Sequence, residues 1–599
     1  MSGACSCNKN EVVRRLRSSH TAISNAMEEA DTRLAPPAAR GLGKVTPRAR
    51  RDDDAAHQLR AACALTELRA RTYVDGQRHR KPRQITTSIN PRAPKSVVDH
   101  ITLHTARRRI PVSSTEPADP PRPPSSPTHR PIAMAQAERE CMRVVMFPWL
   151  AHGHINPYLE LAKRLVAASP DDHHLDVVVH LVSTPANLAP LAHHQTDRIK
   201  LVELHLPALP GLPPALHTTK GLPAHLMPAL KRACDLAAPR FGALLDQLCP
   251  DIVVYDFLQP WAPLEAAARG VPAVHFNTFS AAAKAFVVHC LKNERTPSAF
   301  PFESISLGGA EEDAKYTARL ISRDDGTAMI PERDRLPLSL ERSSGFVAIK
   351  TCADIERKYV DYLSQLVGKE VVPTGPLLVD SGGSEAKRDG GRITRWLDGK
   401  EPGSVVFVSF GSEYFMSDRQ MAQMARGLEL SRVPYLWVVR FPNAEDDARG
   451  AARSMPRGFK PARGLVVEGW APQWRILSHR SCGAFLTHCG WSSVLESMAA
   501  GVPMVALPLH IDQPLNANLA VELGAAAARV KQERFGEFKA EDVARAVRSA
   551  VNGRERVAAR RRARELREVM ARNNGDDRQI ATLLQRMARL CGKGQAVPN

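Results

Sequence analysis

The sequence predicts an α/β protein of two halves, each built on a parallel sheet whose strands alternate with helices. Short apolar runs typical of buried strands alternate with helical periodicity, as in Arg143–Pro148 followed by Tyr158–Val166. A stretch rich in Gly and Pro, between Val372 and Gly403, interrupts this alternation. Beyond it the strand–helix pattern begins again, so we expect two units of similar length.

Further strands are expected at regular intervals in both halves. In the first half they are Asp176–Ser183, Asp251–Tyr255 and Pro272–Phe276. In the second half they are Ser404–Phe410, Tyr435–Val439, Leu465–Glu468, Ala484–Thr487 and Met504–Leu507. We expect a loop at Trp149–Pro157 and a last helix at Arg578–Leu590, which packs back across the first half.

The first 140 residues of the 599-residue chain differ from the rest. They hold 25 Lys and Arg against 14 Asp and Glu, and a Pro/Ser run from Pro117 to Pro131. Such a composition cannot bury enough apolar surface to offset chain entropy, which predicts a disordered extension. A targeting segment is a second interpretation, against which its acidic residues argue. A third is that translation begins at Met134.

Composition argues against several other classes of protein. The net charge of +19 is compatible with a nucleic-acid partner. The glutamates within Arg554–Arg572 instead predict a solvated, ion-paired helix face. The 11 cysteines lack zinc-like spacing, and a chain this long does not need a disulfide framework. The sequence contains no apolar run of about 18 residues, the length that a membrane-spanning helix needs. We therefore expect a cytoplasmic monomer without a nucleic-acid partner or an integral membrane segment.

The segment Thr487–Glu496 combines a strand end, a tight turn at Gly490 and a helix start. Free backbone N–H groups and the positive helix end favour a phosphate there. His488, Ser492 and Ser493 add side-chain donors at the same place. Ser493 and Glu496 also match the S-x-x-E capping box, so the alternative is that these two only cap the helix.

His154 and Asp256 are candidates for proton transfer. His154 lies near the start of a predicted helix, and the unperturbed imidazole pKa of about 6.5 suits a general base. Asp256 ends the strand Asp251–Tyr255 and would orient the imidazole and stabilise its protonated form. The alternative for Asp256 is a loop or cap residue. A metal site at His152 and His154 lacks a matching carboxylate cluster.

At these residues the sequence resembles a known family. Its motifs stand in the order of the 44-residue donor signature of plant family-1 UDP-glycosyltransferases: Trp470-Ala-Pro-Gln473, His488-Cys-Gly-Trp491, Glu496, Gly501-Val-Pro503 and Asp512-Gln513. The resemblance implies the GT-B fold, in which two Rossmann-like domains face a cleft. We expect an acceptor domain at 141–385, a UDP-sugar domain at 386–575, and a C-terminal helix at 576–599 packed on the first domain.

The resemblance also assigns roles to single residues, with the UDP-sugar as co-substrate and no cofactor or metal. It names His154 and Asp256 as the catalytic pair. Trp470 would stack on the uracil, and Gln473 and Glu496 would hold the ribose. The diphosphate would contact His488, Ser492, Ser493 and Ser412, and the sugar would contact Trp491, Asp512, Gln513 and Thr278. Ala471 and Gly490 complete the donor-binding set. Most of the family has Asn where this chain has Ser492.

Four further segments resemble the branch-forming clade of that family, which extends the sugars of flavonoid, terpenoid or apocarotenoid glycosides. They are Pro148–His154, Leu222–Met227, Tyr255–Trp261 and Ile355–Tyr359. The resemblance implies inverting, metal-independent transfer of glucose from UDP-glucose to the sugar of such a glycoside. The alternatives are an aglycone or plant-hormone acceptor, UDP-rhamnose or UDP-xylose as donor, a catalytically idle glycoside-binding relative, and a basic nucleic-acid-binding protein.

Overall fold

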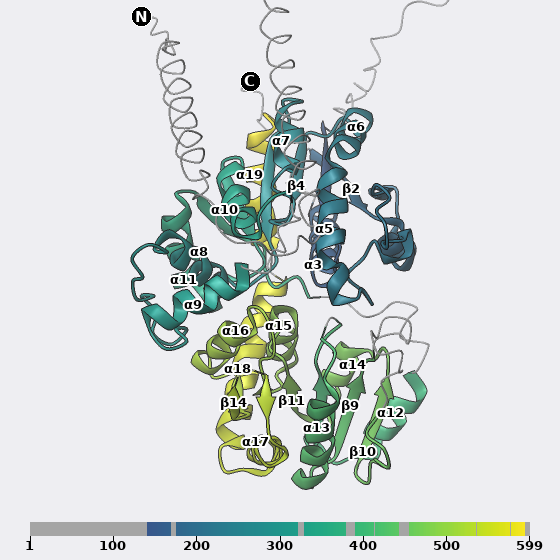
Figure 1. Cartoon of the computed structure of the whole chain (residues 1–599), viewed down its shortest axis with the longest axis vertical. Helices are drawn as coiled ribbons and strands as arrows, with labels where there is room; N and C mark the ends of the chain where they lie inside the picture. Colours follow the sequence, from purple (N-terminus) through teal and green to yellow (C-terminus); the bar gives the residue numbers. More distant parts are fainter. Residues whose placement is uncertain are drawn as a thin grey trace, which may run out of the picture. The chain divides into compact units, whose positions relative to one another are not determined.

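The computed structural model describes residues 140–168, 175–321, 329–378, 390–412, 414–441, 455–534, 536–575 and 577–593. Within these ranges the chain forms two parallel sheets flanked by helices, together with a two-stranded antiparallel sheet (Figure 1). The predictions for residues 1–139, and for a domain boundary at residue 385, lie outside the described residues.

The first sheet has the strand order β3-β2-β1-β4-β5-β6-β7, with all neighbours parallel. The bounds are β1 Glu140–Phe147, β2 Leu175–Ser183, β3 Ile199–Glu203, β4 Ile252–Tyr255, β5 Ala273–Asn277, β6 Phe346–Ile349 and β7 Glu370–Pro373. The central strands are rich in buried apolar residues because both faces of the sheet are covered. The strand order reverses between β1 and β4, so the carboxyl ends of these two strands form a topological switch point.

The second sheet repeats this topology with the order β10-β9-β8-β11-β12-β13. The bounds are β8 Val405–Ser409, β9 Tyr435–Val439, β10 Gly464–Glu468, β11 Cys482–Thr487, β12 Met504–Ala506 and β13 Ala526–Arg529, and the small sheet pairs β14 Gln532–Arg534 with β15 Glu537–Phe538. The switch point of the second sheet lies between β8 and β11. The prediction of an α/β protein with two Rossmann-like sheets is therefore confirmed.

Helices join most pairs of consecutive parallel strands in both halves. In the first they are α3 His152–Ala167, α4 Pro185–Leu188, α5 Met227–Leu236, α6 Ala238–Leu248, α7 Ala262–Ala267, α8 Ala281–Lys292, α9 Ala310–Ile321, α10 Glu332–Arg342 and α11 Ala353–Val367, with short 3-10 turns η1 Ala189–His194, η2 Pro214–Leu216 and η3 Ala224–Leu226. Those that follow are α12 Gly390–Asp398, α13 Asp418–Ser431, α14 Gln473–Leu477, α15 Trp491–Ala500, α16 Gln513–Glu522, α17 Ala540–Asn552, α18 Arg556–Gly575 and α19 Asp577–Leu590.

The last helix, α19, belongs by its contacts to the first sheet. Its buried residues Ile580, Leu583, Leu584 and Met587 follow helical spacing and share one apolar cluster with β1 and α3. In Figure 1 the yellow α19 accordingly lies among the blue and teal elements of the first half. The chain therefore leaves the second sheet at α18 and ends against the first.

The two halves share an apolar cluster, formed by α8 and α11 on one side and by α15, α16 and α18 on the other. Hydrogen bonds also cross the same boundary, and two of them lie beside this cluster. Ser280 Oγ donates to Asn516 Oδ1 over 2.7 Å, and the Tyr359 hydroxyl donates to Glu522 Oε2 over 2.6 Å. The helices that follow β5 and β6 are thus fixed against the first helices after β11 and β12.

Candidate active site

The first group of candidate residues lies at the switch point of the first sheet. Helix α3 begins at His152, earlier than the expected start at Tyr158, so His154 stands in its first turn. His154 Nδ1 lies 2.7 Å from Oδ2 of Asp256, which follows β4. The Asp256 side chain is 1% exposed and that of His154 is 14% exposed. The structure therefore brings the two residues together, with the carboxylate buried.

This hydrogen bond determines the chemistry of the imidazole. Because Nδ1–H donates to the carboxylate, Nε2 keeps its lone pair and can accept a proton. Burial by itself would raise the pKa of Asp256, but the charge and hydrogen bond of His154, with help from Lys284, lower it. An ionised Asp256 stabilises the imidazolium that forms when His154 takes a proton. Thr278 Oγ1 lies 3.4 Å from Nδ1, beside the pair.

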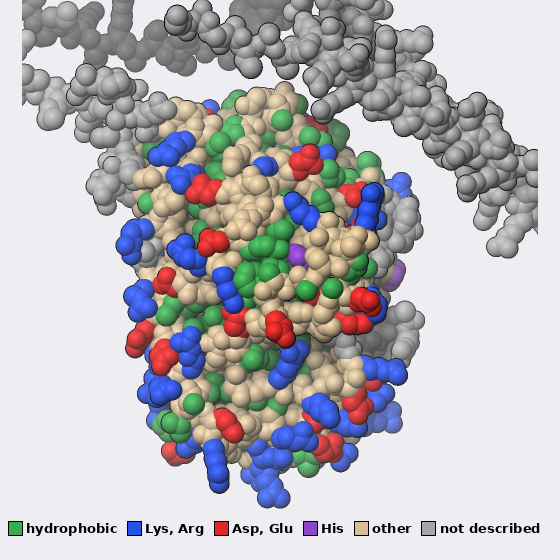
Figure 2. All heavy atoms as spheres, turned by 90° about the vertical axis from the view of Figure 1, so that its left-hand side faces the viewer, with side chains coloured by type: hydrophobic (Ala, Val, Ile, Leu, Met, Phe, Trp, Pro, Cys, Tyr) green, Lys and Arg blue, Asp and Glu red, His purple; other side chains and the backbone are tan. Residues whose placement is uncertain are grey.

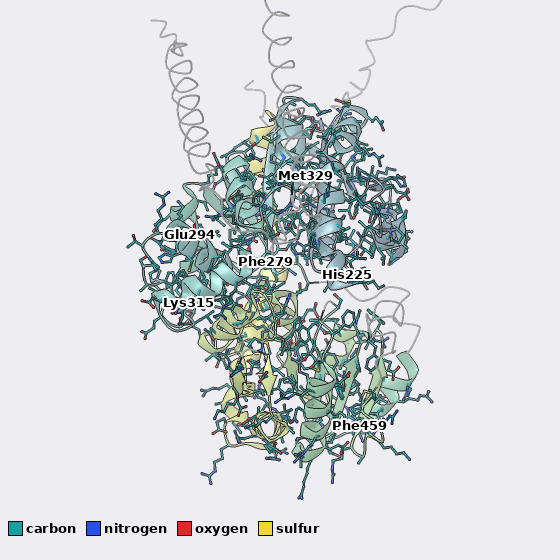
Figure 3. All side chains as sticks on the ribbon, in the orientation of Figure 1. His225, Phe279, Glu294, Lys315, Met329 and Phe459 are labelled. Atoms are coloured by element: carbon teal, nitrogen blue, oxygen red, sulfur yellow. The ribbon has the colours of Figure 1, made fainter. Side chains whose placement is uncertain are left out.

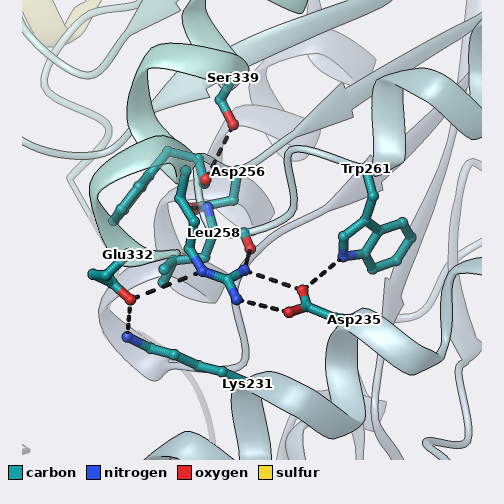
Figure 4. Close-up of polar contacts among 9 residues, drawn as sticks. Lys231, Asp235, Asp256, Leu258, Trp261, Glu332 and Ser339 are labelled. Atoms are coloured by element: carbon teal, nitrogen blue, oxygen red, sulfur yellow. Dashed lines mark hydrogen bonds and ion pairs between the residues drawn. The ribbon is translucent and has the colours of Figure 1, made fainter. Parts of the chain in front are cut away.

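Helix α10 holds the loop that carries Asp256. Arg335 Nη1 donates to the Leu258 carbonyl over 2.6 Å, and Ser339 Oγ donates to the preceding carbonyl over 3.0 Å (Figure 4). Two hydrogen bonds of 3.0 and 2.7 Å to Asp235 fix the buried Arg335 guanidinium in turn. A bidentate pair of this kind is rigid, so Arg335 holds the backbone after Asp256 in place.

Two phenylalanines surround the His154 ring. The ring centroids of Phe257 and Phe279 lie 6.2 and 5.5 Å from it, and Figure 3 labels Phe279 in the turn before α8. The Lys284 ammonium lies over both phenyl rings, at 4.5 and 4.8 Å. Burial lowers the pKa of Lys284 to about 8. This cation was not predicted from the sequence, although a lysine within an apolar helical run is itself a signal.

The second group lies at the switch point of the second sheet, where β11 ends and α15 begins. Gly490 is the N-cap of α15, and the first intrahelical bond runs from Val494 N to Gly490 O. The N–H groups of residues 491–493 precede this bond, and no side chain caps them. A helix start of this kind attracts an anion, because its N–H groups and its dipole both favour negative charge.

The interpretation of Ser493 and Glu496 as a capping box is wrong. Because α15 begins at Trp491, Ser493 lies inside the first turn and no side chain caps the helix. Ser493 Oγ instead accepts from Gln473 Nε2 over 3.2 Å, and Glu496 Oε2 accepts from the same amide nitrogen over 2.7 Å. The structure thus brings the two predicted ribose ligands, Gln473 and Glu496, into contact.

His488 lies in the turn between β11 and α15, against two glycines. A Cβ added to Gly490 would lie 2.6 Å from His488 Nε2, and one added to Gly411 would lie 2.9 Å away. A side chain at either position would therefore displace the imidazole. Cys489 adopts a φ of +65°, a strained conformation for a residue other than glycine. Burial lowers the pKa of His488 to about 4, so the neutral ring keeps one N–H to donate.

The predicted base-binding and phosphate-binding residues outside this turn are accessible. Trp470 follows β10 and is 41% exposed, which excludes a purely core role for its indole. Ala471 beside it and Ser412 after β8 are partly buried. The predicted stacking of Trp470 on uracil is therefore sterically open.

The predicted sugar-binding residues already use some of their polar groups in hydrogen bonds within the protein. The buried Trp491 donates its indole N–H to the Lys350 carbonyl over 2.7 Å, which leaves only its backbone N–H for a ligand. Gln513 Oε1 accepts from the N–H groups of residues 509 and 510, over 2.9 and 2.8 Å. Its amide N–H groups remain for a sugar hydroxyl. Burial raises the pKa of Asp512.

The two groups of residues lie within electrostatic range of one another. The pKa of Asp512 is raised by burial, and the charges of Lys284 and His154 oppose this rise. Asn516 donates to Asp512 Oδ2 over 2.7 Å and accepts from Ser280 at the start of α8. The candidate sugar ligand on α16 is thus linked to the elements that surround the candidate base.

The described ranges also bear on other kinds of site. There, no three His, Cys, Asp or Glu side chains are placed to hold a metal ion, and no helix is long and apolar enough to cross a bilayer. The cysteines among these residues are free thiols. Arg562 in the basic helix α18 pairs with Glu565 over 3.0 Å, and Figure 2 shows acidic side chains among the basic ones on the face in view.

Comparison with known protein families matches both halves of the chain. Residues 140–378 match the family described as "Glycosyltransferase, N-terminal domain". Residues 376–559 match the family described as "UDP-glucoronosyl and UDP-glucosyl transferase". Together the two matches span both Rossmann-like sheets.

Individual relatives agree with these matches. Mogroside IIIx synthase of Siraitia grosvenorii is 40% identical over 454 residues, which cover 75% of this chain and 93% of the relative. Beta-D-glucosyl crocetin beta-1,6-glucosyltransferase of Gardenia jasminoides is 41% identical over 413 residues, or 68% and 90% of the two chains. The structure of Phytolacca americana UGT2 complexed with UDP-2fluoro-glucose and pterostilbene is similar with a TM-score of 0.60 at 26% identity, covering 76% of this chain and 100% of that one. The chain therefore belongs to the plant UDP-glycosyltransferases and has their GT-B fold.

Proposed function

We propose that the protein transfers glucose from UDP-glucose, with inversion, to a hydroxyl on the sugar of a terpenoid, apocarotenoid or flavonoid glycoside. The observation that carries the proposal is the 2.7 Å hydrogen bond between His154 and Asp256. It gives the first half a base, while the second half presents an uncapped helix start for the diphosphate. A base and an anion site are what displacement of a nucleoside diphosphate requires.

The proposed reaction is a single displacement. His154 Nε2 takes the proton of the acceptor hydroxyl, and the acceptor oxygen forms a bond to the anomeric carbon. The bond from that carbon to the β-phosphate oxygen breaks, and its electron pair leaves with UDP. Asp256 stabilises the imidazolium, and the N–H groups at the start of α15 stabilise the departing diphosphate. Attack on the face opposite the leaving group inverts the anomeric centre.

The proposed contacts to the sugar donor use groups that can still interact with a ligand. The exposed indole of Trp470 offers a face to the uracil. Glu496 accepts a bond from Gln473 and retains lone pairs for ribose hydroxyls. Asp512 would accept hydrogen bonds from sugar hydroxyls, and the amide N–H groups of Gln513 would donate to them. These features support a glucose donor, with UDP-rhamnose and UDP-xylose as alternatives.

The proposed acceptor class is supported by the relatives and by the four clade-like segments. The names of the two relatives above designate a mogroside synthase and a glucosyltransferase of a crocetin glucoside. Two of the segments contain His154 and Asp256 themselves. In Ile355–Tyr359, however, Glu356 accepts from the N–H groups of Ala281 and Ala282, so this segment supports the start of α8 rather than an acceptor.

The test is an acceptor screen with product analysis. The protein is incubated with UDP-glucose and matched pairs of monoglucosides and aglycones, and released UDP is measured with the mass of each product. We expect glucosides to react faster than their aglycones, and added EDTA to leave the rate unchanged. Faster turnover of the aglycones would support the aglycone-specific alternative.

The same assay separates the remaining alternatives. Replacing UDP-glucose by UDP-rhamnose or UDP-xylose identifies the donor, and product NMR gives the linkage and the anomeric configuration. A retained configuration, or no turnover of any acceptor in the screen, would refute the proposed reaction. The predicted monomer and the cytoplasmic location are tested by light scattering and by microscopy of a fluorescent fusion.

A further inference from the structure

Lys350 joins the first half of the molecule to the start of α15. It directly follows β6, and its side chain is buried at 2% exposure. Its Nζ donates to Ser492 Oγ over 2.8 Å, and its backbone carbonyl accepts from the Trp491 indole over 2.7 Å. The residue is thus held at both ends by the first turn of α15.

The position of this ammonium group is electrostatically unfavourable without an anion. The N-terminus of a helix carries a partial positive charge, so it repels a cation. Among the described residues, no carboxylate lies within 4.0 Å of Lys350 Nζ. The two that act on it, Glu496 and Glu160, lie farther away, and Glu160 is already paired with Lys163. A buried cation without an ion pair costs free energy, which a bound anion would recover.

The hydrogen bond to Lys350 also fixes the direction in which Ser492 donates. An ammonium group has only donors, so the Ser492 oxygen must accept from it. The Ser492 O–H is then left to donate to another group. It belongs to the same helical turn as the three uncapped N–H groups of residues 491–493. Hydroxyl, backbone N–H groups and ammonium therefore all favour one anion at this helix start.

We propose that Lys350 is a positioning residue for the diphosphate of the nucleotide donor, holding the Ser492 hydroxyl as a donor to a phosphate oxygen and placing a positive charge behind it. The inference rests on the proposed function, because it assumes that the diphosphate lies at the start of α15. As the bond from the anomeric carbon to the β-phosphate oxygen breaks, negative charge grows on the β-phosphate. Lys350 lies where that charge is stabilised, and it transfers no proton in the step.

Burial lowers the pKa of Lys350 to about 8, and the neighbouring glutamates oppose that change. The side chain is therefore mostly protonated at neutral pH. Lys350 and His154 both belong to the first half of the molecule. This half would therefore supply both the charge that stabilises the leaving group and the base that activates the acceptor.

The test compares the binding of UDP and of uridine by calorimetry. In Lys350→Met we expect UDP affinity to fall about tenfold or more, as expected for loss of a charge-assisted hydrogen bond, while uridine affinity stays the same. Lys350→Arg should restore most of the UDP affinity. Lys358→Met is the matched control, because Lys358 lies in the following helix, is 49% exposed and pairs with Glu522.

A second variant keeps the inference testable if Lys350→Met does not fold. Ser492→Ala removes only a hydroxyl, so it should also weaken UDP binding selectively. The double variant should lose less UDP binding free energy than the sum of the losses in the two single variants. Equal UDP affinity in either single variant and in the wild type would overturn the role of Lys350. Wild-type protein that binds no UDP at all would instead refute the proposed function.

Discussion

The two switch points have the same topology and opposite chemistry. In each sheet the strand order reverses at the centre, between β1 and β4 in one half and between β8 and β11 in the other. At the first, the atoms to which we assign a function belong to two ionisable side chains, His154 and Asp256, joined by a hydrogen bond. At the second, they are mainly backbone N–H groups, with a neutral histidine between two glycines.

This difference shows how one topology serves two tasks. A proton acceptor must change its charge during the reaction, so it needs a titratable group with a fixed partner. A diphosphate site must keep its charge distribution constant, which backbone dipoles achieve without titration. We therefore expect side-chain deletions at the first switch point to reduce turnover. Added side-chain volume at the second should reduce nucleotide affinity.

The largest effect is expected from His154→Ala. Loss of the general base should lower kcat by about 10³-fold, while UDP affinity changes less than about twofold, because the nucleotide binds in the other half. Steady-state kinetics and calorimetry on the same preparation check both values. His205→Ala is the control, since its imidazole is 68% exposed. Turnover equal to the wild type would remove His154 from the mechanism.

A smaller loss of turnover is expected from Asp256→Asn. The amide can still form a hydrogen bond to His154 but provides no negative charge for the imidazolium, so kcat should fall by about 10²-fold with folding preserved. Asp246→Asn removes an exposed carboxylate on α6 and should have no effect on turnover. If both variants turned over at the same rate, Asp256 would be a loop residue only.

The sequence predicts β1, β2, β4 and β5 of the first sheet and β8 to β12 of the second, but it misses β3, β6 and β7, although β6 is apolar and buried. The strand at Tyr435–Val439 forms as expected, and the neighbouring predictions differ by one or two residues. Strand β13 was not predicted, because Ala526–Arg529 consists of three alanines and an arginine. Alanine has little preference for strands, and pairing with β12 determines this structure instead.

The site shows the same limit in a different form. His488 and Gln513 could be proposed as donor-binding residues from the sequence because they belong to one contiguous motif. Lys350 was not, because 142 positions separate it from Ser492 and only the packing of α15 on the first half brings them together. The local capping-box pattern failed for a related reason. Gly490 is the N-cap, and its close approach to His488 leaves no room for a capping side chain.

Gly490→Ala tests the second switch point, and we expect a moderate effect. The added Cβ would lie 2.6 Å from His488 Nε2, so the imidazole must move and the helix start must shift with it. UDP affinity should fall about tenfold, as for the loss of one hydrogen bond to a charged group, while kcat at saturating donor changes less. In Gly399→Ala the nearest atom is 3.7 Å from the Cβ, so this variant should bind UDP normally.

The smallest effect is expected in the stability of Lys284→Met. Burial lowers the pKa of Lys284 from 10.5 to about 8, so the protonated side chain costs the native state at most about 3 kcal/mol. Methionine removes this cost, but the loss of the two cation–π contacts offsets about 1–2 kcal/mol of the stability gained. The variant should therefore be more stable by about 1 kcal/mol at pH 7.

The pH dependence identifies the source of this gain. Between about pH 8 and 10.5 the unfolded lysine binds more protons than the native one, so the free energy of unfolding of the wild type rises with pH. Methionine lacks this rise, and the difference between the two proteins should shrink as the pH approaches 10.5. Urea unfolding at pH 7 and 9.5 measures it. A difference independent of pH would mean that packing, and not the buried charge, sets the stability beside the His154–Asp256 pair.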